Sequence, residues 1–187
     1  MTDPACALAQ GDSEPPQDGR RLVAVFTSPV AQQLLHFGEH LGFETVLCDP
    51  SGAEPLPHAG ATVSAVAEAG IDARTDVVVT DHDRPELGPV LRDVLGTPAR
   101  WVGVMGSPRH APPHVPALRE LGVAEDTIAR VHRPIGLNIG SRTPPEIALA
   151  TLAGLLADRA GRPGGFEFGH GGSGRTTGVD PAARASV

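Results

Sequence analysis

The sequence predicts an α/β protein, built as a doubly wound, Rossmann-like parallel sheet in a three-layer α/β/α arrangement. Short continuous apolar runs recur along the chain, as expected for strands buried on both faces. Segments with apolar residues at helical spacing alternate with these runs. We predict strands near 21–26, 44–48, 76–80, 100–104 and 131–135, and helices near 29–41, 86–96, 114–121 and 143–158.

The first strand and helix form a strand–helix–strand unit with the strand near 44–48. Ser28 is predicted to cap the helix through its hydroxyl, and Pro29 suits the first helical position, where no N–H is needed. A dinucleotide-binding fold carries Gly-x-Gly-x-x-Gly at this turn and an acid about 20 residues later. Asp49 has the position of that acid, but the turn has no glycine. Asp49 is therefore either a ligand-binding acid or a strand-end carboxylate, and NAD(P) binding is the less favoured reading.

The middle and the end of the domain follow the same logic. Residues 50–70 are rich in Pro, Gly and Ala, with a short helix expected at 61–69, and a helical turn is expected at 126–131. The last helix has the clearest start signal, because Thr143, Pro144 and Glu146 match an N-cap, a first-turn proline and a capping box. Its residues are apolar nearly all round, so we expect it to be well buried.

Composition indicates which part of the chain folds and which class of partner is excluded. We expect residues 1–19 to be a disordered acidic head, 20–160 to be the folded domain, and 161–187 to be a flexible, glycine-rich tail. The net charge of −7 argues against nucleic-acid binding. No apolar run is long enough to span a bilayer and no leader is evident, so a cytoplasmic protein is expected.

The residues with the strongest claim to binding chemistry lie at predicted strand ends, mainly in two loops at 104–109 and 134–142. In open parallel sheets ligands bind at the carboxyl ends of the strands. Glycine N–H groups, a hydroxyl, an amide and guanidiniums suit a phosphate or another anionic, oxygen-rich ligand. The alternative is that the glycines only make tight turns and the arginines only solvate the rim. The candidate cofactor-binding residues are Asp49, His82, Gly106, Ser107, Arg109, Gly136, Asn138, Gly140 and Arg142.

Histidines give no metal or catalytic prediction. His82 lies between Asp81 and Asp83, and a strand-end histidine in a polar turn is its favoured interpretation over a metal or acid–base role. His36 and His40 are four residues apart on the first helix, a spacing that can bind a metal on one face. No third ligand is evident from the sequence. We therefore predict neither a metal site nor a catalytic residue.

Four motifs resemble the C-terminal Rossmann domain of the XdhC/CoxI family over roughly residues 22–159. They are Thr-Asp-His-Asp at 80–83, Trp-Val-Gly-Val-Met-Gly-Ser at 101–107, Pro-Ile-Gly-Leu-Asn-Ile-Gly at 134–140 and Thr-Pro-Pro-Glu-Ile-Ala at 143–148. The resemblance implies an accessory protein for a molybdenum hydroxylase of the xanthine dehydrogenase or CO dehydrogenase type. It also implies binding of the molybdenum cofactor, as molybdopterin or its nucleotide form, and help in its maturation or insertion.

The same resemblance implies two partners, the apo-hydroxylase and a sulfur-donating desulfurase. Whether the chain also forms a homodimer is left open by the sequence. The sequence departs from the family's pattern at the first turn, where Gly-Ala-Gly-His-Val-Ala is replaced by Phe-Thr-Ser-Pro-Val-Ala at 26–31, and at Asn138, where the family has Asp. This suggests a divergent, stand-alone member. Two alternatives stay open: a degenerate NAD(P)-dependent oxidoreductase, and an interaction module that has kept the fold without a ligand.

Overall fold

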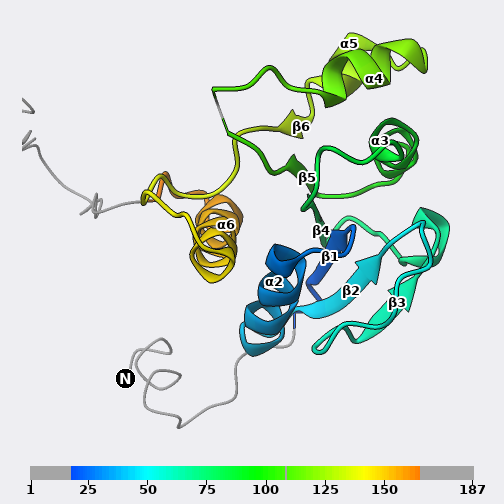
Figure 1. Ribbon diagram of the computed structural model, residues 1–187. Helices are drawn as coiled ribbons and strands as arrows, with labels where there is room; N and C mark the ends of the chain where they lie inside the picture. The colour runs from blue at the N-terminus through cyan, green and yellow to red at the C-terminus, as the bar shows by residue number, and fades with distance from the viewer. Residues whose placement is uncertain (1–17, 108, 165–187) are drawn as a thin grey trace, which may run out of the picture.

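The computed structural model describes residues 18–107 and 109–164, which form one parallel sheet with helices on both faces (Figure 1). The sheet order is β3-β2-β1-β4-β5-β6. The strands are β1 (Arg21–Val25), β2 (Glu44–Cys48), β3 (Ala61–Val63), β4 (Thr75–Val79), β5 (Trp101–Val104) and β6 (Val131–His132). The helices are α2 (Pro29–His40), α3 (Leu87–Leu95), α4 (His114–Glu120), α5 (Glu125–Ile128) and α6 (Pro144–Arg159). In Figure 1, α2 and α6 cover one face and α3, α4 and α5 the other, so the predicted three-layer, doubly wound fold is confirmed.

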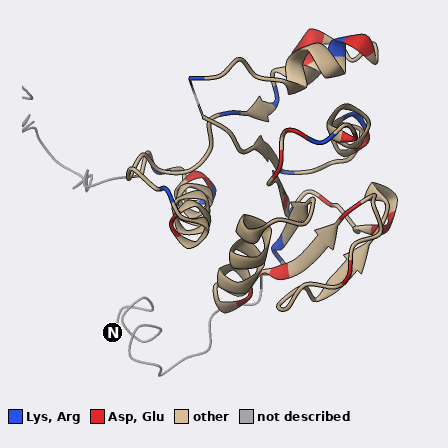
Figure 2. Ribbon diagram, viewed as in Figure 1, with Lys and Arg blue, Asp and Glu red and all other residues tan. Residues whose placement is uncertain are grey.

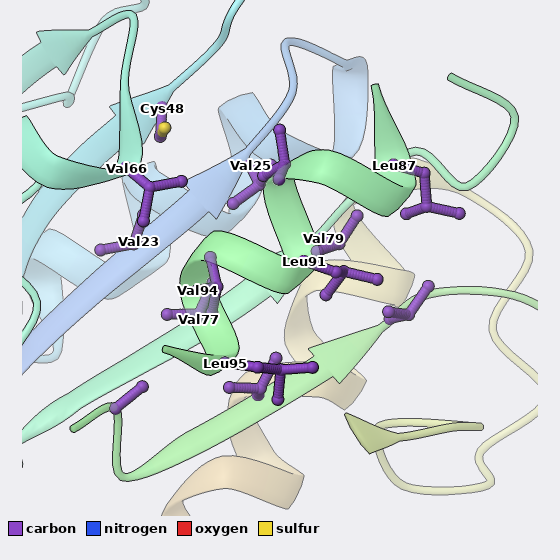
Figure 3. Packing of buried hydrophobic residues seen from close by; sticks show 14 of the residues in the cluster. Val23, Val25, Cys48, Val66, Val77, Val79, Leu87, Leu91, Val94 and Leu95 are labelled. Atoms are coloured by element: carbon purple, nitrogen blue, oxygen red, sulfur yellow. The ribbon is translucent and has the colours of Figure 1, made fainter. Parts of the chain in front are cut away.

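The four central strands β1, β2, β4 and β5 are buried on both faces, which explains their continuous apolar sequences. Val23 and Val25 pair in register with Val77 and Val79 of β4 and pack beneath α3, as Figure 3 shows. The alternate residues of β1 point to the opposite core, which α2 and α6 cover. Because successive side chains of a strand point to opposite faces, each of these four strands supplies both cores.

The strand order reverses between β1 and β4, where the chain leaves β1 toward one side and continues from β4 toward the other. In sheets of this kind the carboxyl ends of the strands at the reversal border a crevice. The turns after β1, β4 and β5 therefore share one edge of the molecule.

The predicted helix starts are present. The Ser28 hydroxyl accepts a hydrogen bond from the Ala31 N–H at 3.0 Å, and Pro29 is the first residue of α2. At the start of α6 the Glu146 carboxylate accepts the N–H groups of Arg142 at 2.8 Å and Thr143 at 3.0 Å. Both signals are local in sequence, which is why they could be predicted.

One predicted element is wrong, and two others end earlier than predicted. The expected helix at 61–69 is instead β3 followed by a single 3₁₀ turn at Val66–Glu68. Pairing of β3 with β2 is a long-range contact that the local sequence does not reveal. The fifth predicted strand ends at His132, two residues before Pro134, which has no N–H to donate to a ladder. The helical turn expected at 126–131 is α5 and ends at Ile128.

The expectation that α6 is well buried holds for one side of the helix only. Ala148, Leu152 and Leu155 lie in the core, whereas the Leu149 side chain is 56% exposed. The helix covers the sheet with one side only, because it belongs to an outer layer of the three.

The predicted acidic head and glycine-rich tail fall almost wholly outside the described residues. Within the described part, no helix has the length and apolar character needed to cross a membrane. Figure 2 shows the arginines of the described part scattered over several elements rather than gathered in one stripe, in keeping with the acidic net charge.

Candidate functional site

A pocket of about 660 Å³ opens at the carboxyl ends of β4 and β5. Its walls come from the end of β4, the turn after β5, the 134–141 connection and the first two turns of α6, with one residue of α2. The size is in the range of small-molecule sites. The lining residues are Val30, Thr80, His82, Met105, Gly106, Ser107, Arg109, Pro134, Ile135, Gly136, Leu137, Asn138, Ser141, Ile147, Ala150 and Thr151.

Six of the nine predicted site residues line this pocket. The first loop contributes Gly106, Ser107 and Arg109, the second loop contributes Gly136 and Asn138, and the end of β4 contributes His82. The two glycine loops therefore meet around one cavity. Asp49, Gly140 and Arg142 are not among the lining residues.

Gly106 gives space to an arginine behind the loop. Its φ is +151°, and a Cβ placed there would lie 2.3–2.8 Å from the Arg133 guanidinium. That guanidinium reaches the carbonyl oxygens of Ser107 and His110 at 3.5 and 3.4 Å. Any side chain at position 106 would displace Arg133. The glycine therefore lets the Arg133 guanidinium pack against the loop that lines the pocket.

Gly136 fixes the second loop on α6. Its φ is +85°, and a Cβ there would lie 3.0 Å from backbone atoms of Ala150 and Thr151. The neighbouring Leu137 N–H donates to the Ala150 carbonyl oxygen at 3.0 Å. Only a residue without a Cβ allows this backbone-to-backbone contact, so Gly136 positions the loop that carries Asn138.

The amino end of α6 offers few donors to an anion. Pro144 and Pro145 have no N–H, and the Glu146 carboxylate already binds the N–H groups of Arg142 and Thr143. These hydrogen bonds hold the pKa of Glu146 below its ordinary value of 4.5. The negative carboxylate offsets the positive end of the α6 macrodipole at this side of the pocket. Positive charge at the pocket therefore comes from Arg109.

The first turn, after β1, is occupied by the protein's own side chains. Asp49 is 1% exposed; it accepts the Thr27 N–H at 2.8 Å and the Ser51 hydroxyl at 2.7 Å. Burial alone would raise the pKa of Asp49, but these hydrogen bonds outweigh it and hold that pKa below 3.8. The Arg84 guanidinium lies 3.6 Å from the same carboxylate and stacks over the Phe26 ring. This geometry favours the strand-end interpretation of Asp49 over a ligand-binding one.

Thr80 links the first turn to the pocket; the sequence analysis named it only as part of the 80–83 motif and not as a site residue. Its hydroxyl contacts the Phe26 carbonyl oxygen at 2.8 Å and the Ser28 hydroxyl at 3.0 Å. Thr80 is the first polar residue after the apolar β4 run, and β4 lies at the strand-order reversal. This position in the sequence could have identified it as a site residue. His82 lies next to it, half-buried, with its Nε2 3.7 Å from Asp83.

A further histidine, outside the pocket lining, is buried. His114, the first residue of α4, is 3% exposed, and burial together with the Arg133 charge lowers its pKa. Across residues 18–107 and 109–164, no group of three or more His, Cys, Asp or Glu side chains is arranged to hold a metal ion. The pocket is thus an apolar chamber with a polar rim of hydroxyl, amide, imidazole and guanidinium groups.

Three comparisons place the chain among known proteins. A model of the XdhC Rossmann domain family matches residues 22–155. The Escherichia coli K12 protein YqeB, described as uncharacterized, is 33% identical over 160 residues, which is 78% of this chain and 28% of that protein. A crystal structure described as a xanthine dehydrogenase from Bacillus halodurans superposes with a TM-score of 0.62 at 23% identity, covering 77% of this chain and 44% of that one. The chain thus spans less than half the length of either, and the superposition shows the fold alone.

Proposed function

The chain belongs to the XdhC Rossmann domain family, and from this premise we propose that it is an accessory protein of a molybdenum hydroxylase of the xanthine dehydrogenase or CO dehydrogenase type. In this role it binds the molybdenum cofactor, as molybdopterin or its nucleotide form, and assists the maturation or insertion of that cofactor. The observation that carries the proposal is the pocket, in which both glycine loops of the family-like motifs meet around one cavity.

The lining of the pocket fits a pterin that bears a phosphate. A pterin is a flat heterocycle with hydrogen-bonding groups along its edge, and the apolar side chains of Val30, Met105 and Ile135 suit its faces. Asn138 and Ser107 would serve the polar edge, and Arg109 would hold the phosphate as a charge-assisted partner. When bound, the cofactor supplies the molybdenum centre that the partner hydroxylase uses.

The first turn favours this ligand over a nicotinamide dinucleotide. A dinucleotide places its pyrophosphate on free N–H groups at this turn. Here the Thr27 N–H is bound to Asp49, the Ala31 N–H is bound to Ser28, and Pro29 has no N–H. A pyrophosphate would have to break these bonds, whereas a ligand in the pocket leaves them intact.

The partner follows from the family and not from the pocket. We propose that the accessory protein meets the apo form of the hydroxylase, with a sulfur-donating desulfurase acting in maturation. Co-sedimentation of the chain with an apo-hydroxylase tests this contact separately from ligand binding. If the two do not associate, with or without cofactor, the accessory role loses its support even if the pocket binds a pterin.

Calorimetric titration of the full chain with a molybdopterin nucleotide, and separately with NADH, tests the ligand. Arg109→Ala should weaken pterin binding by about 1.5–3 kcal/mol, the contribution of a hydrogen bond to a charged group. Arg142→Ala is the matched control, because this arginine lies in the second loop outside the pocket lining, and it should change affinity little.

Each other outcome points to a different function. Tighter binding of NADH than of the pterin would favour the oxidoreductase alternative and refute the cofactor role. Association with the hydroxylase in the absence of any pterin or nucleotide binding would favour a pure interaction module. Equal losses in Arg109→Ala and Arg142→Ala would show that the ligand does not occupy this pocket.

A further inference from the structure

Three histidines gather on the surface of α2, on the side of the β2–β3 connection. His36 and His40 lie one helical turn apart on the same face. His58, which the sequence analysis did not connect with them, lies in the β2–β3 connection and brings its ring against both. The ring centroids are 4.2 Å apart for His36 and His58, 4.8 Å for His36 and His40, and 6.2 Å for His40 and His58.

These spacings match those of a three-histidine metal site. With zinc–nitrogen bonds of about 2.0–2.1 Å, ring centres about 3.2 Å from the ion and tetrahedral angles, the ring centroids of two ligands lie about 5.2 Å apart. The three observed distances lie on both sides of this value. The three rings thus lie within the range of distances that one shared ion needs, and they stand at interplanar angles of 53–75°.

In the present ring orientations, hydrogen bonds place the hydrogen on Nδ1 in two of the three imidazoles. The Nδ1 of His40 lies 2.9 Å from the His36 carbonyl oxygen, which can only accept, so this Nδ1 carries the hydrogen. The Nδ1 of His58 lies 2.6 Å from the Glu39 carboxylate and donates to it in the same way. In both neutral imidazoles Nε2 then carries the lone pair. A carboxylate that holds the second ring nitrogen of a ligating histidine is a recurring outer-shell feature of metal sites.

We propose that His36, His40 and His58 bind a divalent transition-metal ion of the zinc class, with Glu39 as a positioning residue for His58 and water as the fourth ligand. No such group in the described part is already arranged around one point, so binding requires the rings to rotate. The His58 side chain is 35% exposed and the Glu39 side chain is 56% exposed, so solvent space is available for this rotation. Imidazole ligands suit zinc, copper and nickel rather than magnesium or calcium.

The site is separate from the proposed cofactor pocket. The pocket touches α2 at Val30, near the start of the helix, whereas the histidines lie in its second half and beyond it. A bound ion would join α2 to the β2–β3 connection, which contributes the edge strand of the sheet. The inference does not depend on the ligand of the pocket.

Titration of the full chain, freed of metal with EDTA, tests the site with zinc(II) as the probe. Calorimetry should show saturable binding, and zinc should raise the melting temperature. His58→Gln and, independently, His40→Gln should each weaken zinc binding at least tenfold and remove the thermal shift. Glu39→Gln should weaken binding by about 10–100-fold, the usual effect of losing an outer-shell partner. His110→Gln, at an exposed histidine elsewhere, is the matched control and should bind as the wild type does.

Cobalt(II) provides a second readout, because its visible spectrum distinguishes tetrahedral from octahedral coordination. An intense tetrahedral spectrum in the wild type and in His110→Gln, lost in His58→Gln, supports the proposal. Unchanged zinc affinity in a His36→Gln/His58→Gln double variant that is folded by circular dichroism would place the ion elsewhere and overturn it. The absence of saturable zinc binding to the wild type would also overturn it.

Discussion

Asp76→Asn should strongly destabilise the protein, because Asp76 holds two arginines from distant elements. Its side chain is fully buried in β4. One carboxylate oxygen accepts the Arg100 Nε–H at 2.6 Å and the other accepts the Arg159 Nε–H at 2.7 Å. Arg100 immediately precedes β5 and Arg159 ends α6, so this carboxylate ties the last helix to the sheet.

The magnitude follows from what asparagine cannot provide. Its amide keeps one acceptor oxygen but directs an NH₂ group at the second guanidinium. Arg100 keeps its ion pair with Asp158 at 2.5 Å, whereas Arg159 loses the carboxylate with which it pairs. Removing one partner of a buried pair costs about 3–5 kcal/mol. The two arginine side chains are 25% and 17% exposed and keep some hydration, so the lower end applies, about 3 kcal/mol. For a chain of this size that corresponds to a fall in melting temperature of about 6–12 °C.

Urea unfolding followed by fluorescence measures this effect, because Trp101 is the single tryptophan and is buried in β5. Asp93→Asn is the matched control: its carboxylate pairs with Arg92 at 2.9 Å, but both side chains are about half exposed. Such a pair contributes less than about 1 kcal/mol. If Asp76→Asn lost no more stability than Asp93→Asn, the view that this buried carboxylate anchors α6 would be refuted.

Three further predictions concern backbone strain, pH and thiol reactivity. Gly136→Ala should cost about 2–4 kcal/mol, from its left-handed φ and the contact with α6, whereas Gly140→Ala, at φ +71° in open space, should cost only about 1–2 kcal/mol; equal costs in urea unfolding would contradict this. Burial and a nearby guanidinium lower the pKa of His114 below 6.5 in the folded protein. As the pH falls, His114 therefore binds a proton more readily in the unfolded chain than in the folded one. The free energy of unfolding should therefore fall as the pH drops below about 6.5, and fall less in His114→Gln; parallel pH profiles would contradict this. Burial, with nearby carboxylates, raises the pKa of the Cys48 thiol to about 11. In a Cys6→Ser variant, iodoacetamide at about pH 8 should therefore label Cys48 only after the protein is unfolded. Rapid labelling of the native protein would contradict this.

The fold class could be predicted from the sequence because its signals are local. The buried strands needed only continuous apolar runs, and the starts of α2 and α6 needed only the capping pattern within four residues. The edge strand β3 could not be found in this way, because a three-residue strand exists only through its pairing with β2. The exposed side of α6 was missed for a related reason: apolar composition says that a helix is buried, but not on which side its neighbours lie.

The candidate site divides in the same way. That the loops following β5 and β6 lie together could be predicted, since neighbouring parallel strands end at one edge. The sequence could not show that Ser141 faces the cavity while its neighbours Gly140 and Arg142 do not, because that depends on how the loop packs on α6.

By itself, then, the sequence determined the layers of the fold, the helix caps and the meeting of the two glycine loops, since hydrophobic periodicity and turn chemistry act over a few residues. Only the tertiary structure decided that Asp49 is bound by the protein's own first turn, and that His58 joins His36 and His40. These contacts bring together residues about 18–22 positions apart, and their geometry depends on packing that the chain reaches only after the sheet and helices have formed.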